Sequence, residues 1–154
     1  MRASKRSVAV LAYDGLCTFE FALAVEIFGL RRPELGVPWY DFKVCAVEPG
    51  PLRAEGGITM LARHGLRAIE SASTVVVPGW RHELEEPPPA VIASLRRAHA
   101  RGARLISICS GAFVLAATGL LSRAARRLGF SRPQPAAWEQ VAGTCRRASA
   151  ALWS

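Results

Sequence analysis

A single cysteine interrupts the long apolar stretch from Arg104 to Leu121, at the triplet Cys109-Ser110-Gly111. The residues before the triplet favour a buried strand, and those after it recur with helical spacing. A tight strand-to-helix turn of this kind is a nucleophile elbow, which lifts one side chain above a sheet and aims backbone N–H groups at whatever lies there. The pattern therefore predicts that Cys109 is a reactive thiol, with an inert core thiol as the alternative.

An acidic residue and a glycine turn could serve the same chemistry. Glu20 lies near the start of a predicted helix, where a carboxyl could donate a hydrogen bond to a thiolate or act as a base. The alternative for Glu20 is an ordinary first-turn acid stabilised by the helix dipole. Backbone N–H groups of the turn Pro78-Gly79-Trp80, with that of Ser110, could form an oxyanion hole. Trp80 could roof a pocket or pack against a partner subunit.

These expectations give two sets of site residues. The catalytic candidates are Cys109 and Glu20, and the ligand-binding candidates are Gly79, Trp80, Ser110 and Gly111. The histidines offer no obvious partner base, since His64 and His82 fall in predicted loops and His99 on the polar side of a helix. The four cysteines are scattered without a C-x-x-C pair, which argues against zinc and against a disulfide framework. We expect no metal and no cofactor.

The elements that must position these residues follow from the apolar pattern. Strands are predicted at residues 7–13, 40–47 and 73–78 and directly before Cys109; helices are predicted at 19–30 and 90–100 and directly after Gly111, with a hairpin or displaced edge strand at 52–62 and one helical turn at 65–71. Thr18 is expected to cap the first helix. Phe19, Leu23, Ile27 and Leu30 recur at helical spacing, which predicts that this helix is deeply packed.

Strands that alternate with helices in this order predict an α/β fold with a mostly parallel sheet and helices on both faces. In such a sheet, sites form beyond the carboxyl ends of the strands. Three predicted loops qualify: residues 14–18, 78–82 and 109–111.

Composition and charge narrow the class of protein. A chain of 154 residues, 51% of them hydrophobic, suits one globular domain. The uncharged run 105–121 is shorter than the roughly 20 residues of a membrane span and contains serine and glycine, so we expect a cytoplasmic protein without a membrane segment. The net charge is +8, of which residues 123–154 contribute +5 through six arginines and one glutamate. Arginines without a recognisable nucleic-acid motif are a weak sign of DNA binding.

Three motifs together resemble the ThiJ/PfpI superfamily, whose fold is that of class I glutamine amidotransferases. They are YDGLCTFEFALAVEIFGL at residues 13–30, VVVPGW at 75–80 and ISICSGAFVLAATGLL at 106–121. They are most similar to one branch, the N-terminal domain of AraC-type transcriptional regulators (FtrA-like or GlxA-like). The resemblance implies a flavodoxin-like three-layer sandwich. It also implies that Cys109 is the elbow cysteine and Glu20 its companion acid.

The resemblance covers about residues 6–122. It implies a ThiJ/PfpI domain at residues 1–122 whose C-terminal part is incomplete, because the chain departs from the branch after that point. The branch continues with a Thr-His-Trp-like segment and then a pair of helix-turn-helix motifs, whereas this chain has Gly129 near the expected histidine. Residues 123–154 form a basic, arginine- and alanine-rich tail of the kind that out-of-frame translation of a GC-rich gene produces. We therefore expect a truncated or frameshifted chain that lacks the DNA-binding half.

Two functions follow from these observations. The first is a regulatory domain of an AraC-family regulator that senses an unidentified small molecule or forms a homodimer, with DNA bound only through the missing C-terminal domain. The second is a cysteine-dependent ThiJ/PfpI-type enzyme, an amidase, glyoxalase-like or deglycase-like catalyst acting through Cys109. A redox-sensing thiol protein lies between them. The departure after residue 122 removes the histidine expected as general base, which favours a protein that is not an enzyme.

Overall fold

The structure is a computed structural model that describes residues 6–82 and 85–121. Its main elements belong to one compact unit that ends at Thr118. In chain order they are β1 (Ser7–Ala12), α1 (Thr18–Ala24), η1 (Val25–Gly29), η2 (Pro33–Leu35), β2 (Asp41–Ala46), β3 (Pro51–Ala54), β4 (Ile58–Leu61), β5 (His64–Gly65), α2 (Leu66–Ser71), β6 (Thr74–Val77), α3 (Pro89–Ala100), β7 (Arg104–Ser107) and α4 (Gly111–Ala117). The predicted order of strands and helices is confirmed, with the short strand β5 added before α2.

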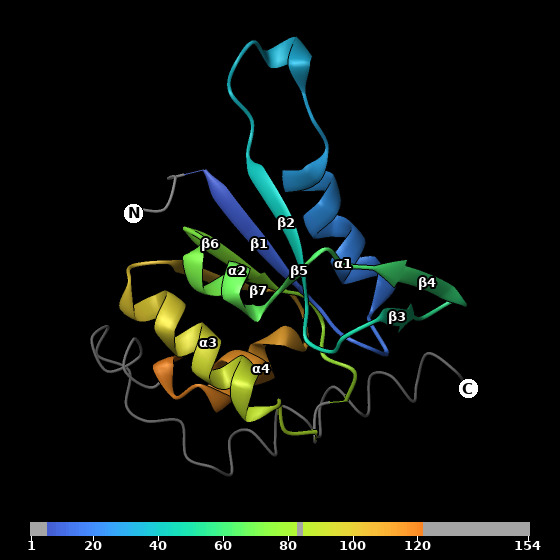
Figure 1. Cartoon of the computed structure of the whole chain (residues 1–154), viewed down its shortest axis with the longest axis vertical. Coiled ribbons are helices and arrows are strands. Elements are labelled where there is room, and N and C mark those ends of the chain that lie inside the picture. The colour runs from blue at the N-terminus through green and yellow to red at the C-terminus, as the bar shows by residue number, and fades with distance from the viewer. Residues whose placement is uncertain (1–5, 83–84, 122–154) are drawn as a thin grey trace. The chain divides into compact units, whose positions relative to one another are not determined.

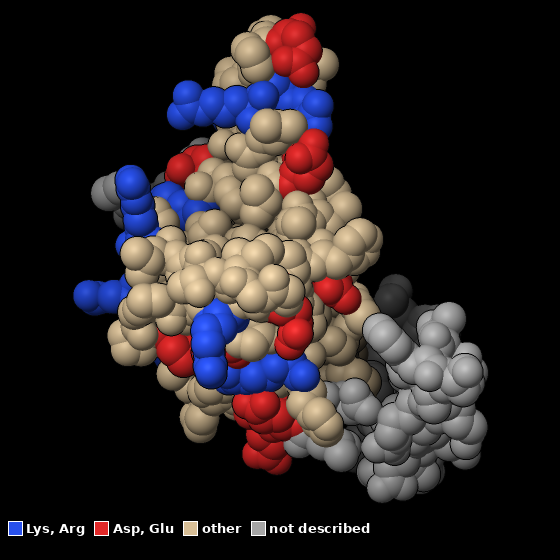
Figure 2. Space-filling view, turned by 90° about the vertical axis from the view of Figure 1, so that its right-hand side faces the viewer, with Lys and Arg blue, Asp and Glu red and all other residues tan. Residues whose placement is uncertain are grey.

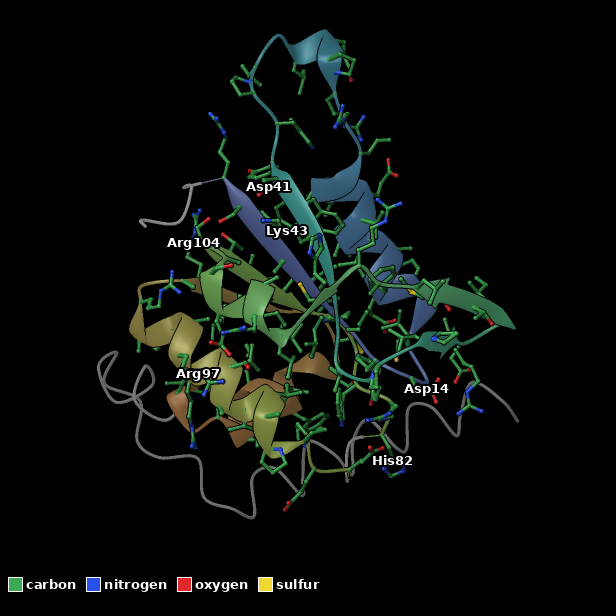
Figure 3. The ribbon with its side chains drawn as sticks, viewed as in Figure 1. Asp14, Asp41, Lys43, His82, Arg97 and Arg104 are labelled. Carbon is green, nitrogen blue, oxygen red and sulfur yellow. The ribbon has the colours of Figure 1, made fainter. Side chains whose placement is uncertain are left out.

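The five-stranded sheet has the order β5-β2-β1-β6-β7, and every pairing in it is parallel. The register sets Val10 of β1 between Val44 of β2 and Val76 of β6. Because the strands are parallel, their carboxyl ends meet at one edge. Figure 3 shows Asp14 and His82 at this edge, opposite Asp41 and Arg104, which begin β2 and β7.

Alternation along β1 divides the core between the two faces of the sheet. Ala9 and Leu11 belong to a buried cluster with residues of α2, α3 and α4, whereas Val8 and Val10 pack with Ala24 of α1. This is the period of two that a fully buried strand requires. Helices therefore cover both faces, and the predicted α/β three-layer sandwich with a mostly parallel sheet is confirmed (Figure 1).

The first helix differs from the prediction in its shape and in the face that it buries. It becomes a π-helix over η1, where the N–H of Leu30 donates to the carbonyl of Val25 at 3.0 Å. The residues that pack on the sheet side are Phe21, Ala24 and Phe28. The stripe expected to be deeply packed is exposed instead; its exposed fractions are 76% for Phe19, 38% for Leu23, 49% for Ile27 and 45% for Leu30. Figure 2 shows a broad area without charged residues on this side of the molecule.

The sequence predicted that Thr18 caps the first helix, and this prediction is wrong. Cys17 occupies the N-cap position of α1 and makes no side-chain cap hydrogen bond. The Thr18 hydroxyl instead donates to the carbonyl oxygen of Glu55 at 2.6 Å, which ties α1 to the turn between β3 and β4. These two strands form the predicted hairpin as a separate antiparallel pair.

Two further expectations concern the basic tail and a membrane-spanning segment. The basic tail at residues 123–154 lies outside the described residues. Within the described ranges, none of the helices combines the length and the apolar character needed to cross a membrane.

Candidate functional site at the carboxyl edge of the sheet

The elbow at Cys109 has the strained backbone that a nucleophile turn requires. Cys109 has a φ of 51°, and it is the one described residue other than glycine in the left-handed region. A side chain in that region costs about 1–3 kcal/mol, which the surrounding hydrogen bonds must offset. On one side the N–H of Ile108 donates to the carbonyl of Val77, and on the other the N–H of Gly111 donates to the carbonyl of Ile108, both at 3.0 Å. The predicted elbow is present, and it holds the Cys109 side chain exposed to solvent.

Ser110 joins the elbow to the turn that follows β6. Its hydroxyl oxygen accepts a hydrogen bond from the N–H of Trp80 at 2.8 Å and donates to the carbonyl of Trp80 at 3.1 Å. The N–H of Trp80 is therefore already satisfied. This corrects the expectation that it is free to join an oxyanion hole.

Trp80 supports the turn from inside the protein. Its ring is 2% exposed and lies 4.6 Å from the ring of Tyr13, measured between centroids. The indole N–H donates to the carbonyl of Glu85 at 3.0 Å. A tryptophan buried in this way presents no surface to a partner subunit and no roof to an open pocket, so both expectations for its ring are corrected.

Gly79 is the point where the loops after β1 and β6 approach each other. A Cβ atom on Gly79 would lie 3.0 Å from the sulfur of Cys17 and 3.3 Å from the carboxyl carbon of Glu20. Glu20 is half-buried in the first turn of α1, so its carboxyl borders the Gly79 backbone rather than standing free in solvent. The absence of a side chain at Gly79 makes this approach possible.

Cys17 is a site residue that the sequence analysis did not single out. Its thiol donates a long hydrogen bond, 3.9 Å, to the carbonyl oxygen of Trp80, which is the oxygen that also accepts from Ser110. Burial raises the pKa of Cys17, and negative charge on Glu20 and Cys109 raises it further, whereas the hydroxyl of Tyr13 opposes the change. The signal for Cys17 was its position in the loop 14–18, one of the three expected to meet here.

Arg81 is the second residue that sequence reasoning missed. Its guanidinium donates to the carbonyl of Asp14 at 2.8 Å and to the carboxylate of Glu48 at 3.0 Å, and it pairs with Glu85 at 2.8 Å. The same group lies 5.0 Å from the Trp80 ring centroid, a cation–π distance. One side chain thus links the loops that follow β1, β2 and β6.

The loop after β1 also carries an ion pair that predicts a pH effect. Hydrogen bonds from Arg53 lower the pKa of Asp14 to about 2. Since the folded pKa lies below that of the unfolded chain, the ionised pair stabilises the fold above about pH 4, and this contribution is lost as the pH falls toward 2. We expect the urea midpoint of the native protein to fall more steeply over this range than that of Asp14→Asn. Equal slopes for the two proteins, measured by tryptophan fluorescence, would contradict this assignment.

The histidines and acids of the described residues do not gather into a metal site. His64, His82 and His99 are exposed, as predicted. Within residues 6–82 and 85–121, no three His, Cys, Asp or Glu side chains form a group that could hold a metal ion. The site is therefore built from Cys109, Ser110 and Gly111, from the turn at Gly79 and Trp80, and from Cys17 and Glu20.

Comparison with known proteins agrees with this fold. A relative from Streptomyces lividans, an uncharacterized protein encoded in the cpoL 5′ region, is 28% identical over 148 residues, which are 96% of this chain and 98% of the relative. That alignment necessarily includes part of the segment after residue 122. Among solved structures, a cysteine-to-alanine mutant of a DJ-1 superfamily protein from Salmonella typhimurium is 28% identical with a TM-score of 0.61, over 76% of this chain and 63% of that protein.

A second solved structure is an AraC family transcriptional regulator from Pseudomonas putida. It is 20% identical with a TM-score of 0.61, over 75% of this chain and 62% of that protein. This chain thus spans less than two thirds of the length of either solved protein. The model of the DJ-1/PfpI family matches residues 6–127. This match covers most of the chain and includes both Cys109 and Glu20, and the chain therefore belongs to the DJ-1/PfpI family.

Proposed function

We propose that this chain is the regulatory domain of an AraC-type transcriptional regulator, which forms a homodimer and senses a small molecule at the elbow. The observation that carries the dimerising part is the exposed stripe of α1 and η1, formed by Phe19, Leu23 and Ile27. Contiguous apolar surface on a soluble domain marks an interaction site. A helix of this kind suits a two-fold interface, in which each copy covers the stripe of the other.

A groove beside the same helix enlarges this apolar surface. It has a volume of about 360 Å³ and lies between α1 and the hairpin β3–β4. The residues that line it are Leu16, Thr18, Phe21, Ala22, Val25, Glu26, Ala54, Ile58 and Met60. Leu16 and Thr18 flank Cys17, so a change at the elbow site has a short path to the stripe.

Similarity to known transcriptional regulators supports a role in transcription. The three sequence motifs resemble the AraC branch, and the structurally similar P. putida protein is named as an AraC family regulator. We propose that DNA binding belongs to a C-terminal domain outside residues 1–154. Reading the gene downstream of codon 122 in all three frames tests this: a frame with a Thr-His-Trp segment and two helix-turn-helix motifs is expected. If no frame continues in that way, the chain is a free-standing thiol protein.

The dimer predicts a large effect of a charge at Phe19. In a Phe19→Glu variant a carboxylate replaces the most exposed aromatic ring of the stripe, and burying it against a second copy costs about 2 kcal/mol or more. We expect the dissociation constant to rise by roughly thirtyfold or more, as measured by sedimentation equilibrium.

Leu35→Glu is the matched control for this measurement. Leu35 is also exposed, at 54%, but it lies in η2, outside the stripe. The control is expected to dimerise like the native chain. A native chain that is monomeric at every concentration tested, or a Phe19→Glu variant that dimerises normally, would overturn the assignment of this face.

One observation favours the alternative that this chain is a cysteine-dependent enzyme. Cys109 is exposed on a left-handed turn with the carboxyl of Glu20 bordering the same site. Turnover of an amide, a glyoxal or a glycated amine that is abolished in Cys109→Ala would establish a cysteine-dependent enzyme.

A further inference from the structure

The site contains two thiols from different loops. Cys109 stands at the elbow, and Cys17 stands at the N-cap of α1. Both lie beside the turn at Gly79 and Trp80, since Cys17 bonds to the Trp80 carbonyl and the neighbour of Cys109, Ser110, bonds to the same oxygen. Neither of the functions proposed above gives Cys17 a role.

We propose that Cys17 is the resolving thiol of this site: after hydrogen peroxide oxidises Cys109 to a sulfenic acid, Cys17 forms a disulfide with it. The inference rests on the geometry of the site and does not depend on dimerisation, on a small-molecule ligand or on DNA binding. The two thiols belong to one chain, so the disulfide is intramolecular.

The distance between the two loops supports this pairing. The sulfur of Cys17 lies 3.9 Å from the Trp80 carbonyl oxygen, and the hydroxyl of Ser110 lies 3.1 Å from it. A single carbonyl therefore separates Cys17 from the residue that follows Cys109. The negative charge of Cys109 also acts on the Cys17 thiol. Because the Cys109 side chain is exposed, its sulfur has room to turn toward Cys17.

The surroundings of Cys17 contain the groups that its chemistry needs. The hydroxyl of Tyr13 is fully buried and acts on the Cys17 thiol, whose pKa it lowers. A thiolate on Cys17 offers this hydroxyl a charged acceptor, which makes a stronger hydrogen bond than the neutral thiol does. The carboxyl of Glu20 borders the same point on Gly79 as the Cys17 sulfur, where it can accept the thiol proton.

The reaction proceeds in two balanced steps. In the first, the thiolate of Cys109 attacks one oxygen of hydrogen peroxide: an S–O bond forms, the O–O bond breaks, and the hydroxide that leaves takes up a proton to become water. The sulfur loses two electrons and the peroxide gains them. In the second, the sulfur of Cys17 attacks the sulfur of the sulfenic acid: an S–S bond forms, the S–O bond breaks, and hydroxide leaves with the Cys17 proton as a second water. Glu20 is placed to carry that proton.

Peptide mapping of the full chain tests the pairing directly, because trypsin separates all four cysteines. Cys17 falls in residues 7–31, Cys45 in 44–53, Cys109 in 105–123 and Cys145 in 128–146. The reduced protein is treated at low concentration with one equivalent of hydrogen peroxide, blocked with N-ethylmaleimide and digested without reductant. We expect a disulfide between peptides 7–31 and 105–123 that dithiothreitol reverses and whose yield does not depend on protein concentration.

Two variants give the control and the kinetic readout. In Cys17→Ser the sulfenic acid has no resolving thiol, so in excess peroxide a second hydrogen peroxide oxidises it to the sulfinic acid and leaves as water. We expect Cys109 to reach this sulfinic acid, with two added oxygen atoms, about tenfold faster than in the native chain under the same conditions. Cys45→Ala is the matched control, because Cys45 is buried, which raises its pKa to about 12 and makes it inert. It is expected to behave like the native chain.

Three results would overturn the proposal: equal rates of sulfinic acid formation in the native chain and Cys17→Ser, a disulfide from peptide 105–123 to 128–146, or one that forms only between chains. The disulfide in the native protein is read without any variant, so a variant that fails to fold leaves the test intact. Phe19→Glu keeps both thiols, and a disulfide in that variant separates this inference from the dimer.

Discussion

Replacing Gly111 with alanine is expected to lower the free energy of unfolding by about 3 kcal/mol or more. A Cβ atom at this position would lie 2.3 Å from the carbonyl oxygens of both Val77 and Pro78. These are backbone atoms at the end of β6, so they cannot turn away as a flexible side chain could. The start of α4 must therefore move, and the strained turn at Cys109 loses the hydrogen bonds that hold it. Urea denaturation followed by circular dichroism measures the loss.

Gly65→Ala is the matched control for this substitution. Gly65 is exposed: a Cβ atom there meets nothing within 4 Å, and its φ of −109° suits any residue. The control is expected to change the free energy of unfolding by about 1 kcal/mol or less. If Gly111→Ala were as stable as Gly65→Ala, the close approach of α4 to the end of β6 would be wrong.

The second large effect is expected for Arg81→Ala, at about 2–4 kcal/mol of lost stability. Removing the guanidinium leaves the half-buried carboxylate of Glu48 without its ion pair and the carbonyl of Asp14 without a donor. It also removes the cation above the Trp80 ring. Since these partners belong to the loops after β1, β2 and β6, we also expect faster alkylation of the Cys17 thiol by N-ethylmaleimide as the loops separate.

Arg63→Ala serves as the control, because Arg63 is exposed. It is expected to change the free energy of unfolding by less than about 0.5 kcal/mol. Chemical denaturation and the rate of alkylation at Cys17, read in the peptide of residues 7–31, are measured on both variants. An Arg81→Ala protein with native stability and native alkylation would show that the three loops hold together without this side chain.

Some features of this protein were available from the sequence because they depend on neighbouring residues. The apolar runs predict the strands β1 and β6. The break at Cys109 predicts a turn followed by a helix. Each of these signals lies within about ten residues of the chain. The elbow was predicted from such a run, and the structure confirms it with a φ of 51° at Cys109. The alternation of strands and helices likewise predicted the parallel sheet, and with it the edge where the three loops meet.

The first helix shows that the local sequence pattern does not decide which face of a helix is buried. Phe21, Ala24 and Phe28 recur at helical spacing, and so do Phe19, Leu23 and Ile27. Either stripe could have faced the sheet, because both satisfy the same periodicity. The packing against β1 and β6 selects the first stripe and leaves the second exposed. The surface proposed for dimerisation was therefore not predictable from the sequence.

The content of the site was decided by contacts between distant parts of the chain. The sequence named Cys109, Glu20 and Gly79, but nothing local distinguished Cys17 or Arg81 from other loop residues. Their roles arise only after the sheet order β2-β1-β6-β7 brings the loop ends to one edge, where Cys17 meets the Trp80 carbonyl and Arg81 meets Asp14. By itself the sequence determined the order of the main strands and helices and which thiol stands at the elbow. The tertiary structure alone decided which side chains surround that thiol, because their distances depend on strand order and packing rather than on spacing along the chain.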